Sequence, residues 1–473
     1  EVIFWVGVSD VRHARKIALW AVTTTGAAEP RAFRENVAEI AWSTDGRRLV
    51  FHTPDPGDPM FLEEGSGPER PLYTAPPPQH AHYQVWSPGD RFIYFVRGYP
   101  AEEMDLWRIR PDGGEPERLT FHNARVSHPT VLDPSTLLYL AGSADGSGPW
   151  IYELDLDRRT SRRVSDGIQR YTSLSASADG RRLVATADNS RRSLWRLEVS
   201  GSLLGPSAAQ RITLPTAQGR RPRLGPDYLI YVSATGETEH LWKLVGKSAT
   251  ELWSADGARV IGGPAISPRG DRIAFSVLER GQTRLLVIGS DGAGPMVTSE
   301  GRELRGAVEW SSDGRSIVTA VLEAGRPRLF RISPDTGAAV PLVDDYSLDP
   351  SWAPRGDFLV YTGTDVGTTF SLKAATATGQ PHPLPQRLTL SRGPGTRRLR
   401  FLPDSTSLLL LRGDIGHRNL WVWDIATNAL RQLTGFGREI LIGDFDVSPD
   451  GREIVFERIE ESSDVVVIDL PPR

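Results

Sequence analysis

The sequence predicts an all-β protein, a β-propeller of about ten four-stranded repeats that are each roughly 45 residues long. One short pattern recurs along the whole chain: an apolar residue, a turn resembling Ser-x-Asp-Gly, and an aliphatic run. Clear copies are AEIAWSTDGRRLVF (38–51), YQVWSPGDRFIYF (83–95), SLSASADGRRLVAT (173–186), PAISPRGDRIAF (264–275), AVEWSSDGRSIVTA (307–320), PSWAPRGDFLVY (350–361) and DFDVSPDGREIVF (444–456). Weaker copies are HPTVLDPSTLLYL (128–140), RPRLGPDYLIYV (221–232) and RRLRFLPDSTSLLLL (397–411). No window has the 3.6-residue apolar spacing of a helix, and glycines and prolines punctuate the strand-length runs.

One apolar position in each copy, which we call the anchor, sets the period. The anchors are Trp42, Trp86, Val131, Ala176, Leu224, Ile266, Trp310, Trp352, Phe401 and Val447, at intervals of 42 to 49 residues. We expect each anchor to end one strand and the Asp-Gly turn to lead into the next, because Gly accepts a positive φ and Asp or Ser bonds the turn backbone. We also expect the tryptophan anchors to pack between adjacent blades.

Two further short strands complete each repeat, typically with an aromatic residue. They are recognisable in DLWRIRPDGGEPERLT (105–120), SLWRLEV (193–199), HLWKL (240–244), RLFRISPDTGAAVPLV (328–343) and NLWVWDIATNALRQLT (419–434).

The sequence leaves the number of rings open. Ten repeats exceed the four to eight blades typical of one propeller, so residues 1–473 form either one unusually large ring or two consecutive smaller ones. The segment 198–221, rich in small residues, is a candidate division between two rings or a long loop between strands. About three strands precede the first anchor and one, 464–470, follows the last hairpin. We expect these terminal strands to mix in one blade and close a ring, which removes sheet edges.

Composition excludes several classes of protein. Apolar residues make up 39% and charged residues 24% of the chain, as in a soluble folded protein, and no apolar run approaches the roughly 18 residues that cross a bilayer. A net charge of −4 gives no reason to expect a nucleic-acid partner. The absence of cysteine removes disulfides, thiol catalysis and cysteine-ligated metals, and it suits an exported protein. We therefore favour a periplasmic or other extracytoplasmic location over a cytoplasmic one. Because Glu1 leads directly into VIFWVGV, we expect a mature form or an excised fragment.

These repeats resemble those of TolB-type, WD-repeat-like bacterial propellers. The resemblance covers essentially the whole chain and rests on W-S-x-D-G-x-x-[IL] followed by LWxx and a later LT. The segment 431–471 more particularly resembles the C-terminal end of bacterial regulators in which a TolB-like array follows a serine/threonine kinase or winged-helix domain, often across a membrane segment. This resemblance implies a sensory or interaction module in a larger signalling protein, and it identifies no ligand.

Motifs that would indicate catalysis, a cofactor or a metal are incomplete in this sequence. The strings nearest to kinase motifs, at 417–419 and 444–446, lack the required Asp and Gly, so we expect no kinase activity in this chain. Gly246-Lys247-Ser248 lacks the earlier glycine of a phosphate-binding loop, which favours an exposed turn. The alternate polar residues from 444 to 450 imitate a calcium loop, but Val455 stands where a bidentate Glu is needed, so Asp450 and Gly451 are interpreted as turn residues.

Two other motifs are also given a structural interpretation. His80 and His82 form His-x-His at the start of a strand, which puts both rings on one face, but local sequence supplies no third zinc ligand. We therefore expect a solvent-facing loop there and no metal site. Neither Ser143 nor Ser147 in 142–150 fits a G-x-S-x-G frame, so this segment is interpreted as a hairpin tip. The sequence thus predicts no catalytic residue, no cofactor and no metal.

The remaining site candidates are polar residues just upstream of the anchors, where the loop into each innermost strand opens at one face of a propeller. They are His82, Arg125, His128, Tyr171, Arg221, Arg305, Asp345, Tyr346, Arg398 and Asp444. If they converge at one channel mouth, they suit a peptide terminus, a sugar or an acidic ligand. The alternative is that each one merely solvates a water-filled channel.

The sequence leaves two functions open, together with a purely structural spacer as a third. The first is a non-enzymatic module that binds a protein, a peptide or a small ligand at the propeller face. The second is a propeller hydrolase, lyase or dehydrogenase that uses His, Arg and Asp at the channel mouth, because propellers also host catalysis. A metal, a cofactor or a perturbed His–carboxylate pair in the channel would favour the enzyme.

Overall fold

The computed structural model describes residues 2–470 except 9–15, 26–27, 78, 100–103, 144–147, 166–168, 236–237, 280–281, 295, 300, 324–325, 367–368, 392–396 and 415. In these residues the chain is a β-propeller protein whose named strands pair antiparallel in eleven sheets. The only helices in the same residues are two 3₁₀ turns, η1 (Pro88–Asp90) and η2 (Pro206–Ala208). The chain divides into two compact units, unit 1 (1–189 and 462–473) and unit 2 (190–461).

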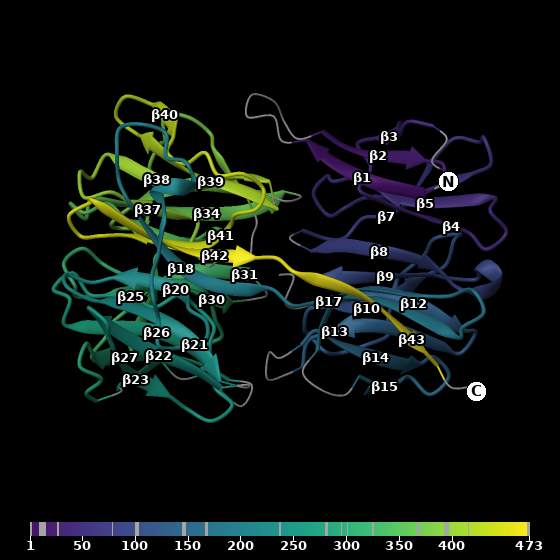
Figure 1. Ribbon diagram of the computed structural model, residues 1–473. Coiled ribbons are helices and arrows are strands. Elements are labelled where there is room, and N and C mark those ends of the chain that lie inside the picture. Colours follow the sequence, from purple (N-terminus) through teal and green to yellow (C-terminus); the bar gives the residue numbers. More distant parts are fainter. Residues whose placement is uncertain are drawn as a thin grey trace. The chain divides into compact units, whose positions relative to one another are not determined.

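Unit 1 contains five of the eleven sheets in the described residues (Figure 1). The first is β1 (Val2–Val8), β2 (Lys16–Val22) and β3 (Arg31–Glu35). The next three are β4 (Glu39–Trp42), β5 (Arg48–His52), β6 (Met60–Glu64) and β7 (Arg70–Tyr73); β8 (His80–Trp86), β9 (Ile93–Gly98), β10 (Met104–Ile109) and β11 (Glu117–Arg118); and β12 (Val126–Asp133), β13 (Thr136–Ala141), β14 (Trp150–Asp155) and β15 (Thr160–Arg163). The fifth is β16 (Arg170–Ala176), β17 (Arg182–Asp188) and β43 (Ser463–Asp469).

Unit 2 contains the other six sheets. One is β19 (Gln210–Arg211), β18 (Arg191–Glu198), β42 (Glu453–Glu460) and β41 (Leu441–Val447). Then come β20 (Arg220–Leu224), β21 (Leu229–Thr235), β22 (Thr238–Val245) and β23 (Ser248–Ser254); and β24 (Arg259–Val260), β25 (Ala265–Ile266), β26 (Arg272–Glu279), β27 (Gln282–Gly289) and β28 (Met296–Ser299). The last three are β29 (Leu304–Trp310), β30 (Ile317–Glu323), β31 (Arg326–Ile332) and β32 (Ala339–Pro341); β33 (Leu348–Trp352), β34 (Phe358–Val366), β35 (Thr369–Thr376) and β36 (Thr389–Ser391); and β37 (Leu399–Phe401), β38 (Ser407–Asp414), β39 (His417–Asp424) and β40 (Ala429–Gln432).

The sheets of unit 2 follow one another in a closed sequence. Strand β20 packs on β25, β25 on β29, β29 on β33 and β33 on β37, while β41 packs on both β39 and β20. In unit 1, β4 packs on β8, β8 on β12 and β12 on β16. Apolar clusters fill the spaces between neighbouring sheets, as where Tyr94 and Val96 of β9 meet Leu137 and Tyr139 of β13. Each sheet is therefore a blade, and the strands that pack on one another from blade to blade, such as β20, β29, β33 and β41, are the innermost ones.

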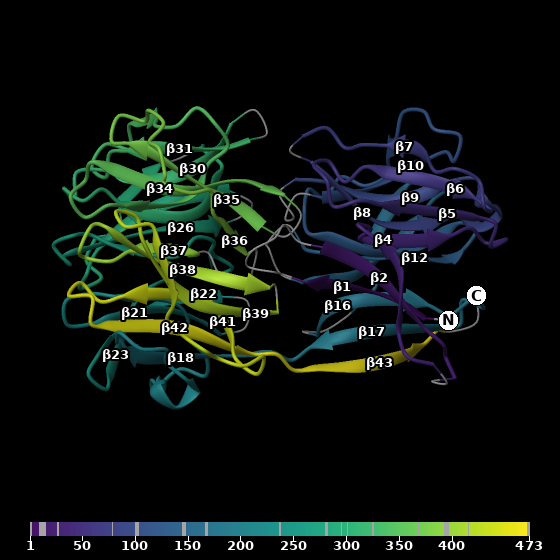
Figure 2. The same cartoon turned by 90° about the horizontal axis from the view of Figure 1, so that it is seen from above.

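The two crossings of the chain between the units exchange strands between blades. After β17 the chain enters unit 2 as β18, which pairs with β42 over its whole length. After β42 it returns to unit 1 as β43, which pairs with β17 from Arg182 to Asp188. Figures 1 and 2 both show β43 beside β17. The expectation that strands from both chain ends share one blade is wrong. Strands β1, β2 and β3 form a sheet of their own, whereas β43 pairs with the edge of β17 that β18 leaves open. The segment 198–221, the candidate division between two rings, lies inside unit 2 and contains η2 and β19.

The anchors behave as the repeat pattern predicts, with one exception. Nine of the ten are the last residue of an innermost strand, and Val131 lies within β12. Trp86, Trp310 and Trp352 are buried, and the indoles of Trp86 and Trp310 each donate a hydrogen bond to a carbonyl of the preceding blade. Trp42 differs, because 49% of its surface is exposed.

The innermost strands share a bulge about three residues before the anchor. The pairing register shifts there in β8, β12, β20, β29 and β33. At that point the backbone of Tyr83, His128, Arg221 and Asp349 has φ between 49° and 58°, and β29 has Gly306 with φ 68°. A bulge redirects the flanking side chains and exposes a backbone N–H to the neighbouring blade. This local feature places the site residues described below.

Candidate functional site

The ten candidate residues are distributed over both units. His82, Arg125, His128 and Tyr171 belong to unit 1, and Arg221, Arg305, Asp345, Tyr346, Arg398 and Asp444 belong to unit 2. Each unit is therefore considered by itself.

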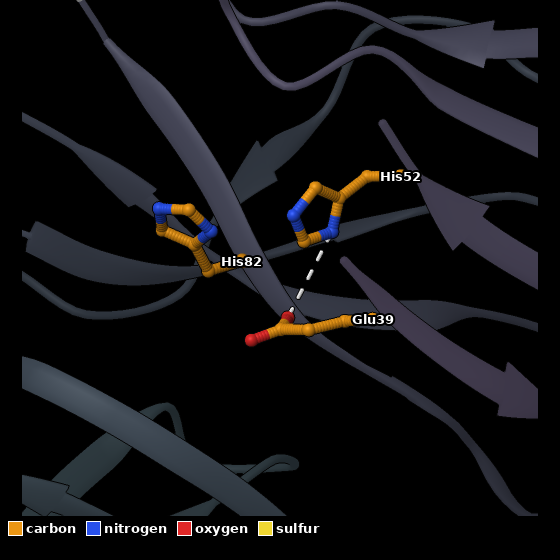
Figure 3. Close-up of side chains that lie close together, drawn as sticks. All are labelled: Glu39, His52 and His82. Atoms are coloured by element: carbon orange, nitrogen blue, oxygen red, sulfur yellow. Dashed lines mark ion pairs between the residues drawn. The ribbon is translucent and has the colours of Figure 1, made fainter. Parts of the chain in front are cut away.

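In unit 1, two neighbouring blades bring together five titratable residues, which we call the histidine cluster. Glu39 begins β4, His52 ends β5, Asp58 lies in the connection from β5 to β6, and His80 and His82 are on β8. One potential ligand atom from each of Glu39, His52 and His82 lies within 4.8 Å of the others, and the same holds for Asp58, His80 and His82. Figure 3 shows Glu39, His52 and His82 side by side.

Asp58 organises the inner half of the cluster. Its Oδ2 lies 2.8 Å from Nδ1 of His80 and 3.5 Å from Nε2 of His82, and it accepts a hydrogen bond from the backbone N–H of Ala81. Because alternate residues of a strand share a face, the rings of His80 and His82 stack, 5.6 Å apart and 11° from parallel. Asp58 and His80 are both buried. The carboxylate is thus fixed by three groups of β8.

The outer half of the cluster reaches solvent. The ring of His52 is buried and lies 5.3 Å from that of His82. Its Nδ1 is 3.8 Å from Oε2 of Glu39 and 2.9 Å from the amide nitrogen of Gln84. The same carboxylate of Glu39 accepts a hydrogen bond from the backbone N–H of Tyr83, at the bulge of β8. The side chains of Glu39 and His82 keep 31% and 29% of their surface exposed, so a ligand can approach them.

Burial and neighbouring charges shift the pKa values in the cluster. Burial lowers the pKa of His82 to about 4, although Asp58 and Glu39 oppose this shift. Burial alone would raise the pKa of Asp58, but the hydrogen bond with His80 and the adjacent histidines bring it below its ordinary value. At neutral pH the cluster therefore holds a neutral His82 beside an ionised Asp58.

The histidine cluster corrects the sequence interpretation of His80 and His82. The two residues do not lie in a solvent-facing loop; they are strand residues, and His80 is only 6% exposed. Their potential co-ligands, Glu39, His52 and Asp58, come from the preceding blade. Local sequence could not reveal them, because the pairing of blades brings residues 22 to 44 positions apart into contact.

The other unit 1 candidates lie close to this cluster or at the surface. The ring of His128, at the bulge of β12, lies 4.6 Å from the ring of Tyr83. Its Nδ1 is buried and has no hydrogen-bond partner among the described residues, and burial lowers its pKa. Arg125 is exposed, and Tyr171, on β16, is partly buried against the core of its blade.

In unit 2 the innermost strands carry a different arrangement, which we call the arginine network. Arg223 and Asp444 are almost completely buried and form a two-pronged ion pair of 2.7 and 3.4 Å. Arg397 pairs with Asp446 at 2.9 Å and with Glu309 at 3.2 Å, and Arg400 pairs with the same two carboxylates. Residues of β20, β29 and β41 and those in and before β37 are thereby linked by ion pairs. The network neutralises itself, so Asp444 contributes to the interior of unit 2.

The remaining unit 2 candidates also have partners within the unit. Arg398 pairs with buried Asp349, and Arg221 donates to the carbonyl of Val260. Arg305 pairs with Glu303, and Asp345 pairs with Lys373 at the surface. Tyr346 is buried.

One arginine in unit 2 is unusual. Arg418 on β39 is 1% exposed, and its Nε and Nη2 have no hydrogen-bond partner among the described residues. Burial, together with the positive charge of Arg398, lowers its pKa to about 10.

The motifs that resemble phosphate-binding, calcium-binding and nucleophile sequences lie in turns and strands. Gly246 and Lys247 form the exposed turn between β22 and β23. Asp450 accepts a hydrogen bond from the Ser448 hydroxyl in the turn after β41, as expected for a turn residue. Ser143 lies between β13 and β14 with its hydroxyl 3.3 Å from that of Tyr152, whereas Ser147 is outside the described residues.

Known proteins resemble this chain in structure but not in sequence. No protein-family profile matches this chain, and neither does the sequence of any curated protein. Among solved structures, the chain resembles TolB from Agrobacterium tumefaciens, with 15% identity over 57% of this chain and 99% of that one and a TM-score of 0.42. The similar structures thus include TolB-type β-propellers. TolB from Acinetobacter baumannii has 10% identity over 90% of this chain and 81% of that one, with a TM-score of 0.36.

Proteins with other names are also among the similar structures. A puromycin hydrolase has 16% identity over 88% of this chain and 57% of that one, with a TM-score of 0.31. At these identities the likeness concerns the fold alone. The described residues include no helix with the length and apolar character needed to cross a bilayer.

Proposed function

We propose that this protein is a ligand-binding propeller protein without catalytic activity, and that its ligand binds at the histidine cluster of unit 1. One contrast between the two units supports the proposal. The charged residues of the arginine network are paired with one another and, apart from the 28% exposed Arg400, are buried. Glu39 and His82 instead combine exposed surface with polar neighbours that hold them in place. A group of convergent polar residues of this kind is typical of a binding site.

The geometry of the histidines favours binding over catalysis. The histidine that is paired closely with a carboxylate is His80, and only 8% of its side chain is exposed, so a substrate has little access to it. The accessible histidine, His82, lies farther from Asp58, at 3.5 Å. A general base must come within hydrogen-bond reach of both its orienting group and its substrate.

A ligand screen tests this proposal. The purified protein is screened by thermal shift against amino acids, short peptides, sugar acids and dicarboxylates, and in parallel against chromogenic esterase, peptidase and glycosidase substrates. We expect at least one compound to raise the melting temperature of the wild type but not that of His82→Ala, with no turnover. Turnover that is lost in Glu39→Gln would instead identify an enzyme.

A propeller enzyme is the second candidate function, and one observation favours it. Asp58 and His80 form a close carboxylate–imidazole pair, and burial lowers the pKa of His82 to about 4, as often found at catalytic sites. The same substrate panel separates the two functions directly.

We also propose that the protein acts outside the cytoplasm as the sensory or protein-binding part of a bacterial signalling protein. The cysteine-free sequence and the resemblance of 431–471 to regulator tails support this role. Fractionation of the source cells with an antibody against the propeller would test the location, and a cytoplasmic signal alone would contradict it.

A further inference from the structure

We propose that Glu39, His52 and His82 bind a divalent transition-metal ion, with Zn²⁺ as the best match, and that Asp58 and Gln84 hold the two imidazoles in place. This inference rests on the site of the proposed function, since it assigns the ion to the same histidine cluster; of the two candidate functions, a bound metal ion favours the propeller enzyme. Two imidazole nitrogens and one carboxylate form a ligand set that Zn²⁺ accepts while leaving a coordination position open.

The distances within the cluster suit a common ion. A tetrahedral ion bound at about 2.1 Å separates its ligand atoms by roughly 3.4 Å. The potential ligand atoms of Glu39, His52 and His82 already lie within 4.8 Å of one another. Closing the site therefore requires these atoms to approach one another by about 1.4 Å at most.

The orientation of the rings points to the same three residues. In Figure 3 Nδ1 of His82 and Nε2 of His52 face one another, with the carboxylate of Glu39 beside them. The second nitrogen of each ring has a neighbour outside this group, although Nδ1 of His52 also lies 3.8 Å from Oε2 of Glu39. Nε2 of His82 lies 3.5 Å from Asp58, and Nδ1 of His52 lies 2.9 Å from the amide nitrogen and 3.3 Å from the amide oxygen of Gln84. Metal-binding histidines typically donate their other N–H to such a carboxylate or carbonyl group.

The support for Asp58 is itself rigid. Its carboxylate accepts a hydrogen bond from the N–H of Ala81 and lies 2.8 Å from Nδ1 of His80. Asp58 and Glu39 also bring two negative charges, which balance a divalent ion. His80 then belongs to the support and not to the ligand set, in agreement with its burial.

Exposure to solvent distinguishes the proposed ligand group from the second group of potential ligands in the cluster. In the group of Asp58, His80 and His82, only His82 keeps substantial exposed surface. In the group of Glu39, His52 and His82, both Glu39 and His82 are about one-third exposed. An ion can therefore enter between these two side chains and retain a water molecule or a ligand group on its open side.

Calorimetric titration of the full chain with Zn²⁺, after removal of metals with a chelator, tests the inference. We expect about one Zn²⁺ per chain, an affinity at least ten-fold weaker in Glu39→Gln, and little binding in His52→Ala or His82→Ala. Asp58→Asn should weaken binding 10- to 100-fold, as supporting residues of metal sites do. His382→Ala is the matched control, because this histidine stacks on Phe358 in unit 2, and its titration should equal that of the wild type.

A loss of Zn²⁺ binding could also arise from misfolding of a variant. Glu39→Gln, which hardly changes the shape of the side chain, and a spectroscopic measurement on the wild type avoid this ambiguity. X-ray absorption of the zinc-loaded wild type should show two imidazoles in the first coordination shell. Absence of Zn²⁺ binding by the wild type, an absorption spectrum without imidazole, or unchanged affinity in Glu39→Gln, His52→Ala and His82→Ala would each overturn the inference. The ligand screen is run on both metal-free and zinc-loaded protein. An organic ligand that binds the metal-free form supports the proposed function even if the protein does not bind zinc. Zn²⁺ binding without binding of any organic ligand supports the metal site and contradicts the proposed function.

Discussion

Nε1 of Trp86 donates a 3.0 Å hydrogen bond to the carbonyl oxygen of Ala41, which precedes it by 45 residues on the neighbouring blade. Trp310 and Ala265 of unit 2 repeat this relationship at 3.1 Å and the same separation. In both cases an arginine that begins the second strand of the preceding blade lies 4.7 Å from the indole ring centre, Arg48 over Trp86 and Arg272 over Trp310. The repeat thus encodes a contact between blades as well as a turn.

Replacing this indole should destabilise unit 1. Trp86→Phe removes the hydrogen bond to Ala41 and weakens the cation–π contact with Arg48, so we expect the free energy of unfolding to fall by about 2 kcal/mol. Urea denaturation followed by circular dichroism measures the change. Trp42→Phe is the control, because Trp42 is half exposed, and its effect should stay within about 0.5 kcal/mol. Equal losses in the two variants would contradict this role of Trp86.

The fold can be predicted from the sequence because its determinants are local. Strand ends, turns and blade length depend on residues within one repeat, so the predictions of nine of the ten anchors, of the Asp-Gly turns and of the three strands before Trp42 are confirmed. The exchange of β18 and β43 could not be predicted, because all strands of this type expose similar edges to pairing. Only the packing of complete blades decides which edge is filled.

Two buried arginines of unit 2 should respond in opposite ways to the same substitution. Arg223→Met removes the guanidinium partner of fully buried Asp444, and we expect a loss of about 3–5 kcal/mol. Arg418→Met removes a buried cation whose Nε and Nη2 have no partner in the described residues, and we expect a gain of about 1–3 kcal/mol. Chemical denaturation of both variants gives the comparison, and a loss of stability in Arg418→Met would show that its charge is compensated.

The turn aspartates should make stability depend on pH. The hydrogen bond from Ser311 lowers the pKa of Asp313, and Ser448 does the same for Asp450. A carboxyl group with a lowered folded-state pKa stabilises the fold above its unfolded pKa of about 3.9, and this contribution disappears as the pH falls through the folded value. Thermal unfolding of Asp313→Asn should therefore show a melting temperature below that of the wild type at pH 7 and a much smaller difference near pH 2. A difference that grows on acidification would refute this explanation.

The last described strand should stabilise unit 1 and not unit 2. Truncation after Glu461 removes β43 and leaves the edge of β17 unpaired, so hydrogen exchange should accelerate in β16 and β17 but not in β21 and β22. Removal of residues 471–473 alone is the matched control and should change neither region. Faster exchange in both units after truncation at Glu461 would contradict the assignment of β43 to unit 1.

The candidate site is less accessible to sequence-based prediction than the fold. His82 lies on the innermost strand β8, upstream of the anchor Trp86, as its place in the repeat predicts. Glu39, His52 and Asp58 give no signal in the sequence, because their role depends on contact between two blades. Asp444 shows the reverse case. Its position before an anchor suggests an exposed channel residue, whereas its partner Arg223 lies 221 residues away in sequence and accompanies it in the interior.

The strand exchange at 189–190 and 461–462 also has a consequence for biosynthesis. All 272 residues of unit 2, from Ser190 to Glu461, are made before the strand that completes the β16–β17 blade. The ends of unit 2 already lie opposite each other, since Arg191 pairs with Glu460. Unit 2 can therefore close on the ribosome while the first-made part of the chain still waits for its final strand. During that interval the open edge of β17 is the place where a chaperone, or a second nascent chain, would find a partner for hydrogen bonding.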